Sequence, residues 1–262
     1  FFAIPITLIW LAARGELRTG FKVQSPMGHV WRGVIGTGAM ACMFTALGIL
    51  PLPEATAIGY AAPLFIVVFA AMFLGEEVRL FRLSAVALGL IGVLIILSPR
   101  LTGLEDAQAA FGAMVALMGA LLAALAQIFI RKLTKTETTS AIVFWFSCTA
   151  SVLSLATLPF GWVWPAPEVA ALLVLAGFIG GLAQILLTSA FRAADASIVA
   201  PFEYASMLFA LVVGYVVFDE IPSAVVLVGA AIVIAAGGLI IWRERALGIA
   251  RAKARRASSP NG

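Results

Sequence analysis

Charged side chains are scarce in this sequence. Asp, Glu, Lys and Arg together make up 11% of its 262 residues, whereas about a quarter of the residues of a soluble globular protein are charged. Apolar residues make up 63%, and the mean hydropathy is +1.09. This composition excludes an ordinary soluble domain, and we expect a membrane protein.

Histidine and cysteine are almost absent as well. The one histidine, His29, has no Glu or second His at ligand spacing, so the sequence assembles neither a zinc site nor a Ser-His-Asp arrangement. Cys42 and Cys148 fall in different apolar runs without metal or redox spacing, and we interpret them as small buried hydrophobic residues. We therefore expect no metal ion, no cofactor and no enzymatic reaction.

Long apolar runs recur along the whole chain, bounded by charges, Pro and Gly. Runs of about 20 residues are long enough to cross a ~30 Å hydrocarbon core as helices. Strand-type alternation is missing, which argues against a membrane β-barrel. The fold class is therefore predicted to be an all-α polytopic membrane protein. The nine predicted spans are 1–13, 33–50, 54–75, 82–98, 110–130, 140–159, 168–191, 197–218 and 223–242.

The basic residues are distributed very unevenly between the connections. Of 17 Lys and Arg, all but Arg100 fall in alternate connections or in the C-terminal tail, which the positive-inside rule places in the cytoplasm. The net charge of +4 is then explained by topology, and no nucleic-acid partner is needed. We expect a multi-pass protein of the cell (inner or plasma) membrane with a cytoplasmic C-terminus, and a basic helix in the tail that lies on anionic lipid.

The chain repeats itself at an offset of 144 residues. Tyr60 falls on Tyr204, and Glu76 falls on Glu220. Five spans fit in 144 residues, and because five is odd, the second copy must enter the membrane with the opposite orientation, as in many secondary transporters. The predicted domains are a first repeat over 1–98, an inverted second repeat over 99–242 and a basic, partly disordered tail over 243–262. The same offset places Phe1 just inside the second helix of a ten-helix protein, so we expect a chain that lacks helix 1 and the start of helix 2.

Motifs in both halves of the chain resemble those of a known family. The first half carries AIGYAAPLF over 57–65, LGE over 74–76 and GLIGVLI over 89–95; the second half carries APFEY over 200–204 and FDEIP over 218–222. This pattern resembles the EamA-type members of the drug/metabolite transporter superfamily. The resemblance implies ten helices in a five-plus-five inverted repeat, both termini in the cytoplasm, and a central cavity between the halves used for alternating access. Asp219 departs from the family pattern, which usually has Gly at this position.

Glu203 is the clearest candidate for a functional charge. It lies six residues into its span, roughly 9 Å at 1.5 Å per residue, and a charge inside a span usually faces the bundle interior or a wet cavity. We expect Glu203 to bind a cationic or amine group of a substrate, or a proton that couples transport. The alternative is a carboxyl group hydrogen-bonded to a neighbouring helix. The matching position in the first half is Gly59, so the carboxylate marks a difference between the two halves.

Four further residues are predicted to contact substrate. Tyr60 and Tyr204 come from symmetry-related helices, and a tyrosine combines an apolar face with a hydroxyl group. Gln184 is an amide deep in its span, and Trp145 offers a ring for stacking. For each of the four, packing or interhelical hydrogen bonding is the alternative. Gln127 is a weaker candidate of the same kind.

Two prolines are predicted to act as hinges. Pro63 lies in the middle of a span, where it removes an amide donor and displaces the carbonyl of Gly59. Pro201 lies in the corresponding span of the second half. Because proline kinks are common in membrane helices, gating at Pro63, Gly59 and Pro201 is a hypothesis.

These features favour a secondary active transporter of small organic metabolites, such as amino-acid-like or nucleoside-like solutes or drugs. A proton or a counter-substrate is the candidate coupling partner. A channel or a non-transporting membrane scaffold remains an alternative, because inverted repeats also occur in pores. An intramembrane enzyme that modifies lipids is less favoured, since it needs clustered Asp, His or Arg at one depth.

Overall fold

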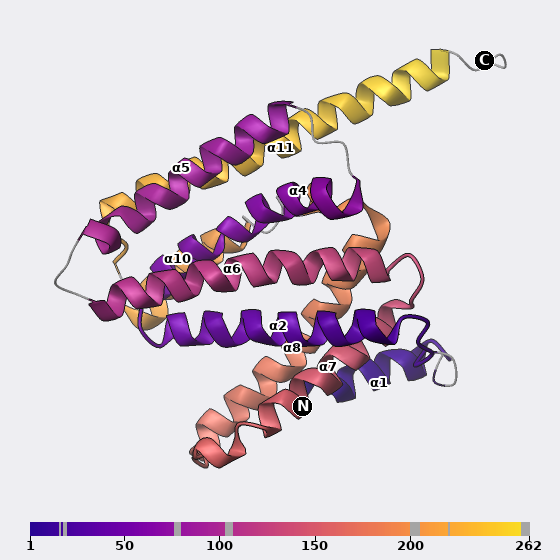
Figure 1. Cartoon of the computed structure of the whole chain (residues 1–262), viewed down its shortest axis with the longest axis vertical. Coiled ribbons are helices and arrows are strands. Elements are labelled where there is room, and N and C mark those ends of the chain that lie inside the picture. Colours follow the sequence, from indigo (N-terminus) through magenta and orange to yellow (C-terminus); the bar gives the residue numbers. More distant parts are fainter. Residues whose placement is uncertain are drawn as a thin grey trace. The chain divides into compact units, whose positions relative to one another are not determined.

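The protein is built from helices joined by turns and short irregular segments in the part that the structure describes. The computed structural model describes residues 1–262 apart from 16, 18–19, 76–79, 103–106, 200–204, 220 and 258–262. In those described residues every regular element is a helix, which confirms the predicted fold class (Figure 1). The helices are α1 (Ala3–Ala13), α2 (Pro26–Leu47), α3 (Leu52–Gly59), α4 (Ala61–Leu74), α5 (Leu80–Thr102), α6 (Ala107–Leu133), α7 (Thr139–Leu155), the short 3-10 helix η1 (Leu158–Phe160), α8 (Pro167–Ala193), α9 (Ala196–Val199), α10 (Ala205–Phe218) and α11 (Ala224–Ala257).

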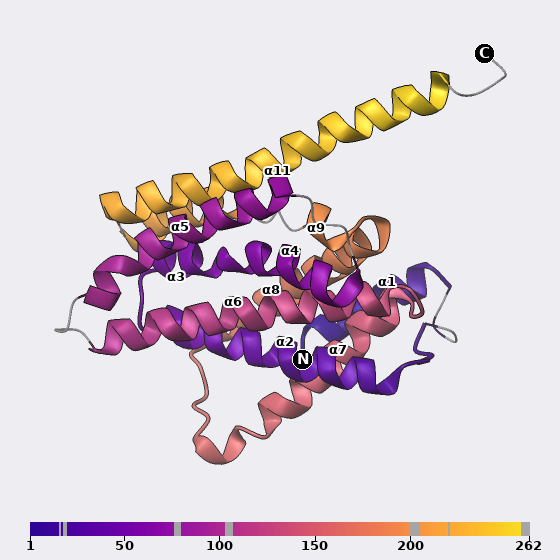
Figure 2. The same ribbon diagram turned by 45° about the horizontal axis from the view of Figure 1, so that its top comes forward.

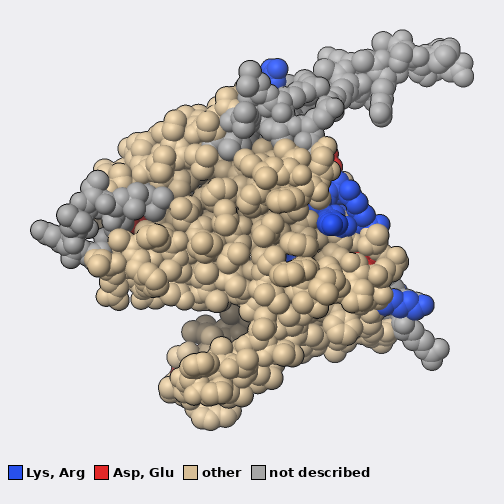
Figure 3. All heavy atoms as spheres, viewed as in Figure 1, with Lys and Arg blue, Asp and Glu red and all other residues tan. Residues whose placement is uncertain are grey.

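Several helices are long and apolar enough to cross a bilayer. Among the described residues, 4 helical stretches satisfy length and hydropathy together: Pro26–Leu47, Glu54–Leu74, Ala107–Leu133 and Pro167–Ala193. Shorter apolar helices are present as well, and helices overlap each of the nine predicted ranges. The described surface visible in Figure 3 carries few acidic or basic groups. These features agree with a multi-pass membrane protein.

The 144-residue offset reappears in the helix boundaries. Helices α3, α4 and α5 begin at Leu52, Ala61 and Leu80, and α9, α10 and α11 begin 144 residues later, at 196, 205 and 224. Helices α4 and α10 also end 144 residues apart, at 74 and 218. The repeat found in the sequence is therefore also present in the secondary structure.

The ends of α4 and α10 explain the departure from the family pattern. Gly75 follows α4 with φ of +67°, and Asp219 follows α10 with φ of +54°. Both residues take the left-handed conformation that commonly ends a helix, and Gly adopts it without steric cost. Asp is one of the few other residues that visit it readily. Asp219 thus performs the same turn as Gly75.

A break separates α3 from α4 where proline predicts it. Helix α3 ends at Gly59, Tyr60 lies between the helices with φ of −69° and ψ of 2°, and Pro63 is the third residue of α4. Proline has no N–H to donate, and its ring displaces the carbonyl four residues earlier. The interruption at Gly59 and Tyr60 follows directly from this local chemistry.

The chain forms two compact units. Unit 1 comprises Phe1–Ala41 and Leu122–Ala196, and unit 2 comprises Cys42–Leu121 and Ser197–Gly262. Each unit combines segments from both halves of the sequence, and the repeat boundaries near 98 and 242 remain a prediction.

In unit 2, α5 and α11 lie side by side over much of their length (Figures 1 and 2). A Cβ atom added to Gly92 of α5 would lie 2.8 Å from the carbonyl oxygen of Gly229 in α11, and one added to Gly229 would lie 2.6 Å from that of Gly92. Small residues of this kind let membrane helices approach closely. Helix α11 continues without interruption through the basic tail to Ala257, so the tail helix is an extension of the last span rather than a separate element.

In unit 1, α1 packs on α7 and α8, and α7 packs on α8. A Cβ atom on Gly177 of α8 would lie 2.6 Å from the Cβ atom of Phe2, and one on Gly33 of α2 would lie 2.6 Å from the Cβ atom of Thr149 in α7. Glycines thus set the spacing between helices in this unit too. These close contacts position the site described next.

Candidate substrate site

A buried arginine lies inside unit 1. The sequence pattern assigns Arg32 to a cytoplasmic connection before a span that begins at 33, but the structure begins α2 at Pro26 and encloses Arg32 in the helix. The earlier start has a local reason, because proline is favoured at the first helical position. Arg32 is only 4% exposed.

The guanidinium of Arg32 contacts the helices α7 and α8. Its Nη2 donates a hydrogen bond of 3.1 Å to Oε1 of Gln184 in α8. Its Cζ lies 3.9 Å from the ring centroid of Phe146 in α7, within the range of a cation–π interaction. The three side chains come from positions far apart in the sequence and meet through helix packing.

The guanidinium lies near the middle of its helix. A Cβ atom on Gly36 would clash with Nη1 of Arg32, so the side chain lies against the helix one turn beyond its own position. Gly36 is ten residues beyond Pro26 in the 22-residue α2, or ~15 Å along a helix of ~33 Å at 1.5 Å per residue. Phe146 is similarly central, seven residues beyond the start of the 17-residue α7. These positions place the cation well inside the span.

The protein provides hydrogen-bond acceptors for only some of the N–H donors of the Arg32 guanidinium. A guanidinium has five N–H donors, yet Nε and Nη1 of Arg32 are buried without a hydrogen-bond partner. Among the described residues no carboxylate contacts Arg32. An arginine at the centre of a membrane helix costs about 2.5–3.5 kcal/mol on insertion scales and is usually associated with function. Arg32 is therefore the strongest candidate for a ligand contact in unit 1.

More polar atoms are buried without partners in the same unit. They are both ring nitrogens of His29 and the side-chain oxygens of Thr37 in α2, Gln127 in α6, Ser151 in α7 and Thr188 in α8. Thr188 follows Gln184 by four residues and so lies on the same face of α8. Buried polar groups are normally hydrogen-bonded, so each of these four helices carries at least one polar atom whose hydrogen-bonding capacity the protein does not use.

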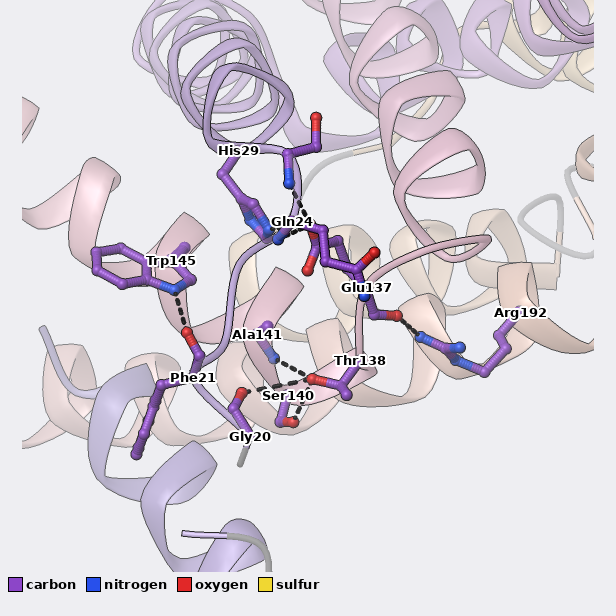
Figure 4. Close-up of polar contacts among 11 residues, drawn as sticks. Gly20, Phe21, Gln24, His29, Glu137, Thr138, Ser140, Ala141, Trp145 and Arg192 are labelled. Carbon is purple, nitrogen blue, oxygen red and sulfur yellow. Dashed lines mark hydrogen bonds and ion pairs between the residues drawn. The ribbon is translucent and has the colours of Figure 1, made fainter. Parts of the chain in front are cut away.

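A second polar cluster holds one end of unit 1 together (Figure 4). Glu137, in the connection between α6 and α7, is 3% exposed. Its Oε1 accepts hydrogen bonds from the backbone N–H groups of Gln24 at 2.7 Å and Ser25 at 2.6 Å, and lies 3.7 Å from Nε2 of His29. A carboxylate at the start of a helix is favoured by the helix dipole. Glu137 therefore anchors the beginning of α2.

The same connection is fixed to α7 and α8. The Thr138 hydroxyl caps α7 by accepting from the Ala141 N–H at 3.2 Å. Arg192 of α8 donates to the Thr139 hydroxyl at 3.0 Å and to the backbone carbonyls of Thr134, at 3.1 Å, and Glu137. Glu137, Thr138 and Arg192 are hydrogen-bonded to the protein, and His29 contributes only its 3.7 Å contact with Glu137, since neither of its ring nitrogens has a hydrogen-bond partner. We interpret this network as structural. Sequence reasoning missed the contact between Glu137 and His29 because 108 residues separate them and neither belongs to a local motif.

The residues that the sequence predicts to contact substrate do not all lie together in the structure. Gln184 lies beside Arg32, as described above. Trp145 donates its Nε1–H to the Phe21 carbonyl at 3.2 Å and is 38% exposed. Tyr60 belongs to unit 2, is 5% exposed, and its hydroxyl lies 2.6 Å from Oγ of Ser206 in α10. The structure thus joins Gln184 to a residue that the sequence assigned to a loop.

Three predicted residues, Pro201, Glu203 and Tyr204, lie outside the described residues. Gly59 and Pro63 flank the break between α3 and α4. In the part of the chain that the structure describes, no group of three or more His, Cys, Asp or Glu side chains is placed to hold a metal ion.

Comparison with known proteins identifies relatives over nearly the whole chain. The model of the EamA-like transporter family matches residues 1–98 and 110–242. An S-adenosylmethionine uptake transporter of Rickettsia bellii (strain RML369-C) is 28% identical over 245 residues, covering 94% of this chain and 82% of the relative. The pseudopaline exporter CntI of Pseudomonas aeruginosa (strain UCBPP-PA14) is 30% identical over 235 residues, covering 89% and 81%. A solved crystal structure shares the fold with a TM-score of 0.70 at 22% identity, covering 91% of this chain and 83% of that one.

Proposed function

The chain belongs to the EamA-like transporter family, and we propose that it is a secondary active transporter that moves a small organic metabolite across the cell membrane by alternating access. The transported solute is an amino-acid-like or nucleoside-like compound or a drug. The C-terminus lies in the cytoplasm, as the distribution of Lys and Arg favours. The protein is thus a transporter and not an enzyme.

The observation that carries the proposal is the family match over both halves of the chain. Relatives along nearly the whole chain are named as an uptake transporter and as an exporter of different small molecules. The repeated helix boundaries at the 144-residue offset support the alternating-access mechanism, because inverted repeats underlie the two states of many secondary transporters.

The proposed substrate contacts are Glu203, Tyr204, Tyr60, Gln184 and Trp145. The hydroxyl of Tyr60 and the amide of Gln184 are polar groups inside an apolar bundle, which supports their assignment. The carboxylate of Glu203 is assigned to an amine group of the substrate or to a coupling proton. An ionisable residue within a span supports that role.

The proposed hinges are Gly59, Pro63 and Pro201. The observed interruption between α3 and α4 supports a hinge beside Tyr60, because a helix with an unformed hydrogen bond bends at low cost. Motion at this break would change the exposure of the Tyr60 hydroxyl to either side of the membrane.

Counterflow in proteoliposomes tests the proposal. The purified protein is reconstituted, the vesicles are loaded with an unlabelled metabolite, and entry of the labelled form is measured over a range of concentrations. A carrier gives saturable entry that internal substrate stimulates. Flux that rises linearly with concentration and is unaffected by internal substrate would indicate a channel, and no flux with any metabolite of a broad panel would indicate a scaffold.

A further inference from the structure

We propose that Arg32, together with Gln184 and Phe146, forms the recognition site for a carboxylate of the transported solute. This inference rests on the proposed transport function and names the chemical class of its substrate. It adds a cation to a set of predicted contacts that otherwise contains one carboxylate, amides, hydroxyls and rings.

The argument begins with the unused donors. Nε and Nη1 of Arg32 are buried without partners, and one hydrogen bond, to Gln184, is present. A planar guanidinium binds carboxylates through two parallel hydrogen bonds, which are among the strongest in proteins. Each parallel pair uses Nη2, which has one N–H besides the one given to Gln184, together with either Nε or Nη1. A carboxylate therefore supplies an acceptor to one of the two unpartnered nitrogens and neutralises the charge.

The neighbours of Arg32 fix its orientation. Phe146 covers one face of the guanidinium at 3.9 Å from the ring centroid, so a ligand approaches in the plane of the N–H groups. Gln184 uses Oε1 to accept from Nη2, and its amide nitrogen keeps two N–H donors. The site thus presents donors from two side chains. The acceptor oxygen of Gln184 is already bonded to Arg32, so it would face an incoming anion only if that hydrogen bond broke.

The depth of the site agrees with transport. Gly36, whose lack of a side chain makes room for Nη1, lies near the midpoint of α2. Transporters of several folds bind substrate near the bilayer midplane. A purely structural arginine that links helices needs its donors satisfied by the protein, whereas here two of the nitrogens are unsatisfied.

A binding experiment tests the carboxylate site without knowledge of the substrate. Benzoate and benzamide have the same shape and differ in charge, so thermal unfolding of the purified protein is measured with each at equal ionic strength. Wild type is expected to be stabilised by millimolar benzoate and not by benzamide. Arg32→Gln is expected to remove the difference, and Arg32→Lys to weaken it at least three-fold in apparent affinity, because a lysine cannot bind in a bidentate manner.

Two further variants separate a ligand site from a general charge effect. Lys132→Gln removes one exposed positive charge from α6 and should leave the benzoate effect unchanged. Gly36→Ala keeps the charge of Arg32 but places a methyl group against Nη1, and should weaken benzoate binding at least three-fold. If Arg32→Gln does not fold, Gly36→Ala and Arg32→Lys decide the question. Equal benzoate effects in wild type and in these variants would overturn the inference.

Transport then distinguishes the two proposals. Counterflow is measured for pairs of metabolites that differ in one carboxylate, such as an amino acid and its amide. A wild type that prefers the acid, with a preference reduced at least ten-fold by Arg32→Gln, supports the carboxylate site. Saturable transport of neutral solutes alone would overturn the carboxylate site and keep the transporter. Benzoate binding without saturable flux of any solute would keep the site and overturn the transporter.

Discussion

Replacing Glu137 by alanine should measure how strongly the connection between α6 and α7 holds the start of α2. The carboxylate accepts two backbone hydrogen bonds, from Gln24 at 2.7 Å and Ser25 at 2.6 Å, and lies 3.7 Å from Nε2 of His29. Hydrogen bonds to charged groups contribute about 1.5–3 kcal/mol each. Gln24 is exposed, so water recovers part of the loss, and the lower value applies to each bond. We expect a loss of ~3 kcal/mol in the free energy of unfolding.

Thermal unfolding in detergent, followed by tryptophan fluorescence, is the assay. At ~2–4 °C per kcal/mol for a chain of this size, Glu137→Ala should lower the midpoint by roughly 6–12 °C. Glu137→Gln keeps one acceptor oxygen without the charge and should lose about half as much. Glu168→Ala is the matched control, because this exposed glutamate of α8 lies at the protein surface. A midpoint for Glu137→Ala within ~2 °C of that of Glu168→Ala would refute the anchoring role.

Three further variants probe the rest of the chain. Gly229→Ala places a Cβ atom 2.6 Å from the Gly92 carbonyl and should destabilise by about 1–3 kcal/mol through overpacking, whereas Gly238→Ala, which meets nothing within 4 Å, should leave the unfolding midpoint unchanged or raised. Glu203→Gln should abolish or strongly reduce uptake, or remove its pH dependence, with membrane insertion intact. Transport kinetics that match wild type from about pH 5 to 8, where carboxyl groups with raised pKa values titrate, would exclude a role of Glu203 in binding substrate or a proton. Pro63→Ala restores the N–H that a continuous helix needs and should slow counterflow several-fold without loss of thermal stability, and an unchanged rate would remove Pro63 from the hinge.

Features set by neighbouring residues could be predicted from the sequence. The interruption at Gly59 and Tyr60 follows from Pro63, because the missing donor and the displaced carbonyl both lie within one turn. The helical fold class follows from the apolar runs alone. The turn at Asp219 was visible only as a departure from a pattern, and its φ of +54° gives the reason.

Features set by packing could not be predicted in the same way. Arg32 looks like a loop residue because it directly precedes an apolar run and follows the basic residues Arg14, Arg18 and Lys22 of the same connection. Its burial depends on α2 beginning at Pro26. Gln184 was a candidate only as a deep amide, and nothing in the sequence indicates that its partner lies 152 residues away. Glu137 and His29 were likewise invisible as a pair. A single sequence contains no signal for such contacts, since each residue is ordinary in its own segment.

Glu137 and Arg32, the buried charges among the described residues of unit 1, differ in the contacts that the protein gives them. Glu137 engages two backbone donors and lies near a third group, so its desolvation is offset within the fold and its removal leaves orphaned N–H groups. Arg32 engages one amide and one ring, and two of its nitrogens have no partner. A well-packed apolar side chain in place of an incompletely paired charge is often neutral or stabilising. Fold stability therefore explains a carboxylate at position 137 better than a guanidinium at position 32, and the proposed carboxylate ligand would offset part of the cost of burying Arg32.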